Sequence, residues 1–97
     1  MTLDQFKASA HQASPPGGLP PLLVALWHDA RGDWDAAHRV AQDVDDEDGA
    51  WVHAYLHRKE GDDGNAAYWY RRAGRSPGRG TLHEEWVTIV EALLEQV

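Results

Sequence analysis

The chain has 97 residues, no cysteine and a formal net charge of −7, so it is long enough for one small domain and offers no disulfide or thiolate chemistry. The acidic balance argues against a nucleic-acid backbone as the main partner. The longest apolar run, residues 22–27, is far shorter than the about 20 residues that a membrane-spanning helix needs. No signal peptide is visible either, so we expect a cytoplasmic protein with no membrane partner. Its composition suggests a bacterial gene.

Residues 1–13 are predicted to form a short N-terminal helix. Thr2 and Gln5 have the spacing of a capping box, and Leu3 and Phe6 share one face of the helix that follows. Residues 14–20 are rich in proline and glycine, which disfavours a helix and predicts a semi-rigid linker.

Residues 21–80 contain two partial copies of one pattern, and each copy predicts a helix, a Gly-Asp turn and a second helix. The expected helices span about residues 21–31, 34–43, 50–60 and 66–73. The turn glycines Gly32 and Gly61 are 29 residues apart, whereas the alanine pairs that follow, residues 36–37 and 66–67, are 30 apart. We attribute the difference to one extra residue in the second turn. A self-similar helix pair at such a period predicts an α-solenoid, in which stacked pairs bury one another's apolar faces.

The acidic segment of residues 44–49 invites comparison with a calcium-binding EF-hand loop. The comparison fails, because Val44 and Tyr55 would stand at the two positions where carboxylate ligands are required. We expect the acidic residues to precede and cap the fourth helix. They have the opposite sign to the basic residues 71–79, and we expect both to be solvated turns.

Residues 81–97 predict an amphipathic C-terminal helix that caps the stack. Thr81 and Glu84 form a second capping box, and an apolar face runs along the helix opposite an acidic one. The predicted fold is therefore all-α, a single α-α superhelix of residues 1–97. The expected core is Leu22, Leu26, Trp34, Ala37, Trp51, Tyr55, Ala66, Trp69, Trp86, Ile89, Val90 and Leu93.

Two segments resemble known helical repeats. Residues 32–37, GDWDAA, resemble the turn of a tetratricopeptide repeat, and residues 66–73, AAYWYRRA, resemble the second helix of a Sel1-like repeat. Pro77 lies where such repeats often place a proline. The resemblance implies a protein-binding scaffold without catalytic activity, and its partner would be another protein or a second copy of the chain.

The expected partner surface lies on the helix of residues 21–31, which is apolar nearly all round. The N-terminal helix either folds back over it or leaves part of it uncovered. An uncovered apolar patch usually marks an interface, and this one would adjoin a row of histidines on the first helices of the two pairs. The predicted partner-binding residues are Leu23, Val24, Trp27, His28, His53 and His57.

The histidines also suggest an alternative function, the binding of a divalent metal ion. His53 and His57 are four residues apart on one helical face, a spacing that can hold a metal. His28 is the repeat counterpart of His57, so the alternative site comprises His28, His53 and His57. Residue Ala54 stands where a metallopeptidase needs a glutamate. The interpretation that we favour is that these histidines are solvated or line a groove, and we expect no cofactor.

No sequence motif indicates an enzyme. The serines lack a nucleophile-elbow pattern, and no glycine-rich phosphate loop is present. The aromatic and basic residues 68–72 could stack on a nucleic acid, but we interpret them as one core tryptophan with solvated neighbours.

Overall fold

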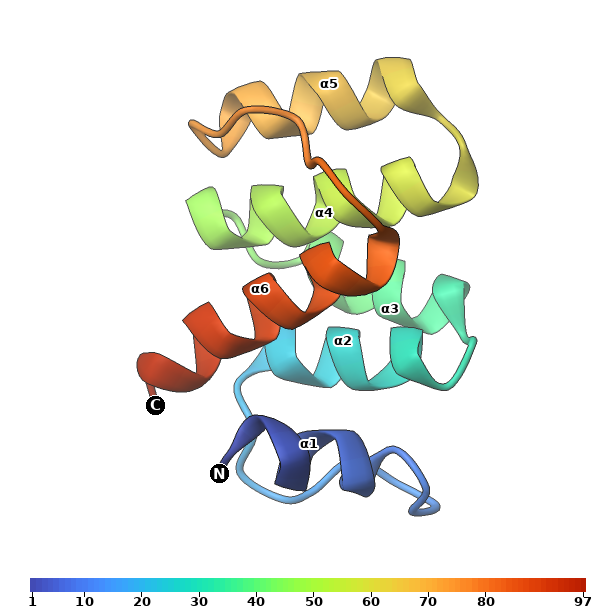
Figure 1. Ribbon diagram of the computed structural model, residues 1–97, viewed down its shortest axis with the longest axis vertical. Helices are drawn as coiled ribbons and strands as arrows, with labels where there is room; N and C mark the ends of the chain where they lie inside the picture. The colour runs from blue at the N-terminus through green and yellow to red at the C-terminus, as the bar shows by residue number, and fades with distance from the viewer.

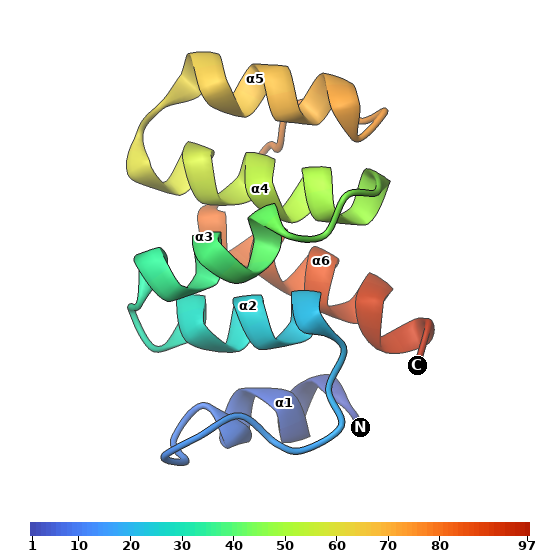
Figure 2. The same ribbon diagram turned by 180° about the vertical axis from the view of Figure 1, so that it is seen from behind.

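The computed structural model describes residues 1–97 and is all-α, which confirms the predicted fold class. The helices are α1 (Leu3–Ser9), α2 (Pro21–Ala30), α3 (Trp34–Gln42), α4 (Glu47–Glu60), α5 (Asp63–Arg72) and α6 (Leu82–Glu95). Helices α1, α2, α4 and α5 lie one above another along the 34 Å long axis, and α3 packs behind α2 and α4 (Figures 1 and 2). None of the six helices combines the length and apolarity that crossing a membrane would require.

The two helix pairs, α2–α3 and α4–α5, repeat with a single spacing. Asp33 and Asp62 are 29 residues apart, and each is the N-cap of the second helix of its pair, with its side chain accepting a backbone N–H. Helix α5 therefore begins at Asp63, three residues before the predicted start. The inferred extra residue in the second turn is wrong, because the capping aspartate and not the alanine pair sets where the helix begins. Ala37 consequently matches Ala66, and both are buried.

Helix α4 also begins three residues earlier than predicted, because Asp46 caps it. The Asp46 carboxylate accepts the Gly49 backbone N–H at 2.7 Å, so the acidic segment contributes the first turn of the helix. A Cβ on Gly49 would lie 2.0 Å from the Val44 carbonyl oxygen, so only glycine fits here. The other end of α4 closes at Gly61, whose φ of 88° is the left-handed conformation that favours glycine.

The last helix does not continue the stack past α5, as a cap of the second pair would. Helix α6 packs instead against α1, α2 and α4 and crosses the front of α2 and α4 in Figure 1. Its apolar face is buried there, and the Trp86 indole N–H donates to the Leu26 carbonyl at 3.2 Å. The connecting residues 73–81 lead the chain back to this face. The predicted amphipathic helix is present, but it covers the side of the stack and leaves α5 without a neighbour beyond it.

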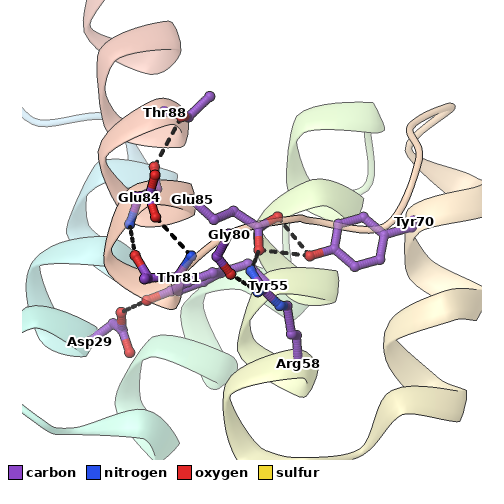
Figure 3. Close-up of polar contacts among 9 residues, drawn as sticks. All are labelled: Asp29, Tyr55, Arg58, Tyr70, Gly80, Thr81, Glu84, Glu85 and Thr88. Carbon is purple, nitrogen blue, oxygen red and sulfur yellow. Dashed lines mark hydrogen bonds and ion pairs between the residues drawn. The ribbon is translucent and has the colours of Figure 1, made fainter.

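Two buried carboxylates fix the position of α4 among its neighbours (Figure 3). Glu85 of α6 accepts hydrogen bonds from the Tyr70 hydroxyl at 2.6 Å and from Arg58 Nη1 at 2.8 Å. Asp29 of α2 accepts from the Tyr55 hydroxyl and from Lys59 Nζ, both at 2.8 Å. A buried carboxylate is tolerated only when it is paired and hydrogen-bonded, so these contacts restrict how α2, α5 and α6 can dock on α4.

Helix α1 folds back over α2, which is one of the two arrangements that the sequence left open. Phe6 is buried, and the Trp27 indole N–H donates to the Ser9 carbonyl at 3.0 Å. Arg31 Nη1 donates to the carbonyls of Ala10 and Gln12. The Pro-Gly linker therefore returns the chain along α1 and closes this end of the stack.

The predicted core is buried, except that Trp34 and Trp69 are only partly buried. Trp34 belongs to α3 and Trp69 to α5, and the ring of each stacks on a histidine. Tyr70, next to Trp69, is the buried aromatic residue of α5.

We expect Glu85→Gln to destabilise the fold by about 2 kcal/mol, because Arg58 would lose its charge partner. The cost stays below that of a fully buried pair, since the Arg58 side chain is 21 % exposed and solvent can reach it. Urea unfolding monitored by tryptophan fluorescence measures the change. Glu91→Gln, on the exposed side of the same helix, is the matched control and should leave stability nearly unchanged. Equal effects of the two substitutions would show that the buried pair has no special role.

Candidate functional site

The apolar patch predicted on α2 is covered in the structure. Leu23 is 0 % exposed and Trp27 is 2 % exposed, while Val24 is partly buried. Helices α1, α3, α4 and α6 all pack on α2, and the return of α1 over α2 covers Trp27. The prediction of a partner surface formed by these apolar side chains therefore loses its structural basis.

The predicted histidines do not share one surface. His28 is partly exposed and lies edge-on against Trp27, with ring centroids 5.1 Å apart. His53 and His57, expected on the solvated or groove-lining side of α4, are only 6 % and 7 % exposed. The solvated alternative is wrong, because α3 and α5 both pack on α4 and enclose the side that its own periodicity leaves polar, although His53 does line a cavity.

The structure brings His53 and His57 together with His38 of α3. One ring nitrogen from each of His38, His53 and His57 lies within 4.8 Å of the other two. The Nε2 atoms of His38 and His53 are 2.9 Å apart, which requires one ring to donate and the other to accept. The set that could hold a metal is therefore His38, His53 and His57, hereafter the histidine cluster, and His28 is not part of it.

Aromatic rings hold two of these imidazoles in place. Trp34 stacks on His38 with centroids 4.8 Å apart, and Trp69 stacks on His53 at 3.9 Å. The Trp34 indole N–H donates to the Leu56 carbonyl at 2.7 Å, which anchors α3 to α4. The geometry of the cluster is thus supported by packing on both sides of α4.

The third imidazole is oriented by a carboxylate. His57 Nδ1 lies 2.6 Å from Glu60 Oε1, one helical turn along α4. A hydrogen bond from Nδ1–H to a carboxylate fixes the tautomer of a histidine and leaves Nε2 with its lone pair. His57 is therefore prepared to act as an acceptor or a ligand through Nε2.

Burial keeps the rings of His38 and His53 neutral. Desolvation, together with the neighbouring His38 and His57, lowers the pKa of His53 to about 4. Desolvation is also the main cause that lowers the pKa of His38, followed by the proximity of His57. Neutral imidazoles offer lone pairs and can accept hydrogen bonds or bind a metal ion.

A cavity of about 240 Å³ adjoins the cluster at the α3–α4 connection. His53 and Trp69 form one side, and the acidic residues of the connection form another, with Arg72 of α5 beside them. The lining residues are Gln42, Val44, Asp45, Asp46, Glu47, Gly49, Ala50, His53, Trp69 and Arg72. The cluster is therefore adjacent to a hollow with an acidic rim.

The sequence analysis missed His38, and one signal could have identified it. The repeat relation links His28 to His57 because they occupy equivalent positions of two pairs, but equivalent positions lie one repeat apart. In a stack of pairs, the second helix of one pair packs against the first helix of the next. His38 follows Trp34 by four residues, so both lie on the face of α3 that this packing turns toward α4.

Helix α5 has a free outer face at one end of the stack. It packs on α4 alone among the helices. Tyr68 on this face is 44 % exposed, and the only other exposed large hydrophobic residues are Met1 and Val97 at the chain ends. Arg72 lies beside Tyr68, with its Nη1 3.3 Å from the phenol oxygen.

Comparison with known proteins gave no match to a family model, to a curated protein or to a solved structure.

We expect the stability of the metal-free protein to fall as the pH drops from about 6.5 to about 4. An unfolded histidine has a pKa of about 6.5, whereas folding lowers the pKa of His53 to about 4, so the unfolded state binds more protons in this range. Stability is complete above the unfolded pKa, and the loss is on the order of 2–3 kcal/mol for one such group. The pKa of His38 is also lowered in the folded state, so His38 adds to the loss of stability at low pH.

Urea unfolding with a chelator present, at several pH values, measures this dependence. His53→Gln removes the titrating ring, so the variant should lose most of the slope even if its stability is lower throughout. A slope that is the same in both proteins would contradict a neutral, buried His53, because the pH dependence would then come from groups other than His53.

Proposed function

We propose that the protein is a non-enzymatic interaction module of the tetratricopeptide-like or Sel1-like helical-repeat kind, and that the outer face of α5 binds an acidic segment of another protein. The proposal rests on the uncovered end of the stack. Helix pairs in such stacks bury one another's faces, and a terminal pair needs a polar outer face or a further neighbour. Since α6 packs across α2 and α4, α5 has no neighbour on its outer side.

The residues of this face support a binding role. Tyr68 is exposed in the middle of α5, and Arg71 and Arg72 are exposed near its end. Tyrosine and arginine are enriched at protein interfaces and among the residues that contribute most to binding. The Arg72 guanidinium lies 5.1 Å from the Trp69 ring centroid, which holds it against the helix.

The charge of the face favours an acidic partner. Within the chain, the nearest carboxylate of Arg72 is that of Asp45, at 3.7 Å, and the Asp45 side chain is 95 % exposed. Such an exposed pair contributes only about 0–1 kcal/mol, so Arg72 can exchange it for a carboxylate of a partner. Arg71 has no ion pair and adds a second positive charge beside Tyr68.

A different protein fits this face better than a second copy of the chain. In a two-fold dimer the same patch meets itself, so Arg71 and Arg72 would face a patch of the same sign. Like charges across an interface oppose association. The net charge of −7 disfavours a nucleic acid for the whole molecule.

We expect a photo-crosslinking amino acid in place of Tyr68 to capture a specific protein from a lysate of the native cells. The same crosslinker in place of Glu91, on the exposed side of α6, is the control and should not give that adduct. Arg71→Glu introduced into the Tyr68 crosslinking protein should reduce the yield of the adduct at least tenfold, because it reverses a charge that faces the partner. Gel electrophoresis and mass spectrometry identify the product.

The proposal fails if the adducts from positions 68 and 91 are the same, or if Arg71→Glu leaves the yield unchanged. Circular dichroism of each variant checks that the fold is retained, which is expected because all three substituted side chains, Tyr68, Arg71 and Glu91, are exposed.

A further inference from the structure

Three imidazoles converge between α3 and α4, and their spacing is close to that of a three-histidine metal site. Zinc binds imidazole nitrogen at about 2.0–2.1 Å in tetrahedral geometry, which places two such ligand atoms about 3.3 Å apart. The Nε2 atoms of His38 and His53 are 2.9 Å apart, and one nitrogen from each ring of the cluster lies within 4.8 Å of the others. Surrounding one ion requires the three ring nitrogens to adopt the spacing of about 3.3 Å. We propose that His38, His53 and His57 bind one divalent transition-metal ion of the zinc class.

Glu60 strengthens the assignment, because it provides the outer contact that metal-binding histidines usually have. A ligating imidazole almost always donates its other N–H to a carboxylate, a carbonyl or water. The contact of His57 Nδ1 with Glu60 Oε1 at 2.6 Å fits this role and leaves Nε2 to coordinate. Glu60 is therefore a positioning residue for the site.

The ligand set determines the class of metal. Imidazole nitrogen suits zinc, copper, nickel and cobalt, whereas calcium and magnesium prefer oxygen ligands. Three protein nitrogens around a tetrahedral ion leave a fourth position for water or a small ligand. The cavity of about 240 Å³ beside His53 provides space next to the ion, and the carboxylates at its rim favour the approach of a cation.

The cluster could instead be a packing feature only. The His38–His53 contact and the His57–Glu60 contact each satisfy two polar groups, and stacking on Trp34 and Trp69 accounts for the burial. Packing of this kind requires no ion and predicts no affinity for one. Metal binding by the purified chain therefore separates the two explanations.

We expect the full-length, tag-free protein to bind one Zn²⁺ per chain after metal has been removed with a chelator. Competition with a chromophoric chelator measures the dissociation constant and the stoichiometry. Co²⁺, used as a spectroscopic substitute, should give the intense visible absorption of a four-coordinate site. No binding of Zn²⁺ at 100 µM added metal, a concentration on the order of 10⁵ times a nanomolar dissociation constant, would overturn the proposal.

Single substitutions test which histidines hold the ion. His38→Gln should weaken Zn²⁺ binding at least 100-fold, because it removes one of three ligands. His28→Gln is the matched control: His28 is the repeat counterpart of His57 but lies outside the cluster, so affinity should change less than twofold. Equal losses in both variants, or none in His38→Gln, would refute the assignment.

Glu60→Gln tests the positioning role, because Glu60 does not coordinate in this arrangement. We expect binding 10–100-fold weaker, as for other outer contacts of metal ligands, with one ion still bound and the Co²⁺ spectrum unchanged in shape. A Glu60→Gln protein that binds Zn²⁺ as tightly as the parent would remove this role.

Two further measurements distinguish a lost metal ligand from a loss of folding in a variant. His38 is only partly buried, and circular dichroism of metal-free His38→Gln should match that of the metal-free parent. Nitrogen-15 spectra of the imidazole rings then report binding directly in the parent protein. Zn²⁺ should shift the ring signals of His38, His53 and His57 and leave His11, His28 and His83 unchanged, and a uniform response of all six would overturn the proposal.

Discussion

The enclosure of α4 is the constraint on which the rest of the structure depends. Every residue from Gly49 to His57 is buried, because α2, α3, α5 and α6 all pack on α4. A helix enclosed in this way cannot leave any polar side chain without a partner. The arrangement of its neighbours therefore has to satisfy the tyrosine, the histidines and the charged residues of α4 as well as its apolar ones.

The buried carboxylates show how this requirement specifies the fold. Asp29 comes from α2 and Glu85 from α6, and α4 supplies a cation to each through Lys59 and Arg58. Burial and the neighbouring carboxylates raise the pKa of the Tyr55 and Tyr70 hydroxyls, so both remain protonated donors. A buried Glu85 without its partners would be a costly unpaired carboxylate, so its contacts with Arg58 and Tyr70 stabilise the observed position of α6.

The two proposed binding sites, for a partner protein and for a metal ion, both adjoin α5. Trp69 stacks on His53 and lies edge-on against Tyr68 with ring centroids 5.2 Å apart, so one helix contacts the histidine cluster on its inner side and carries the exposed tyrosine on its outer side. Arg72 covers both rings, at 5.9 Å from Tyr68 and 5.1 Å from Trp69. An ion at the cluster and a partner on α5 would therefore be separated by a single layer of aromatic side chains.

The sequence alone determined the number of helices and most of their ends, because caps are hydrogen bonds between residues a few positions apart. Thr81 and Glu84 mark the start of α6, and the left-handed Gly61 marks the end of α4. Only the tertiary structure decided which faces meet. The side of α4 with His53 looks polar by periodicity, and its burial depends on α3 and α5. The entry of His38 into the cluster and the position of α6 likewise follow from contacts between residues far apart in the chain, which local spacing does not encode.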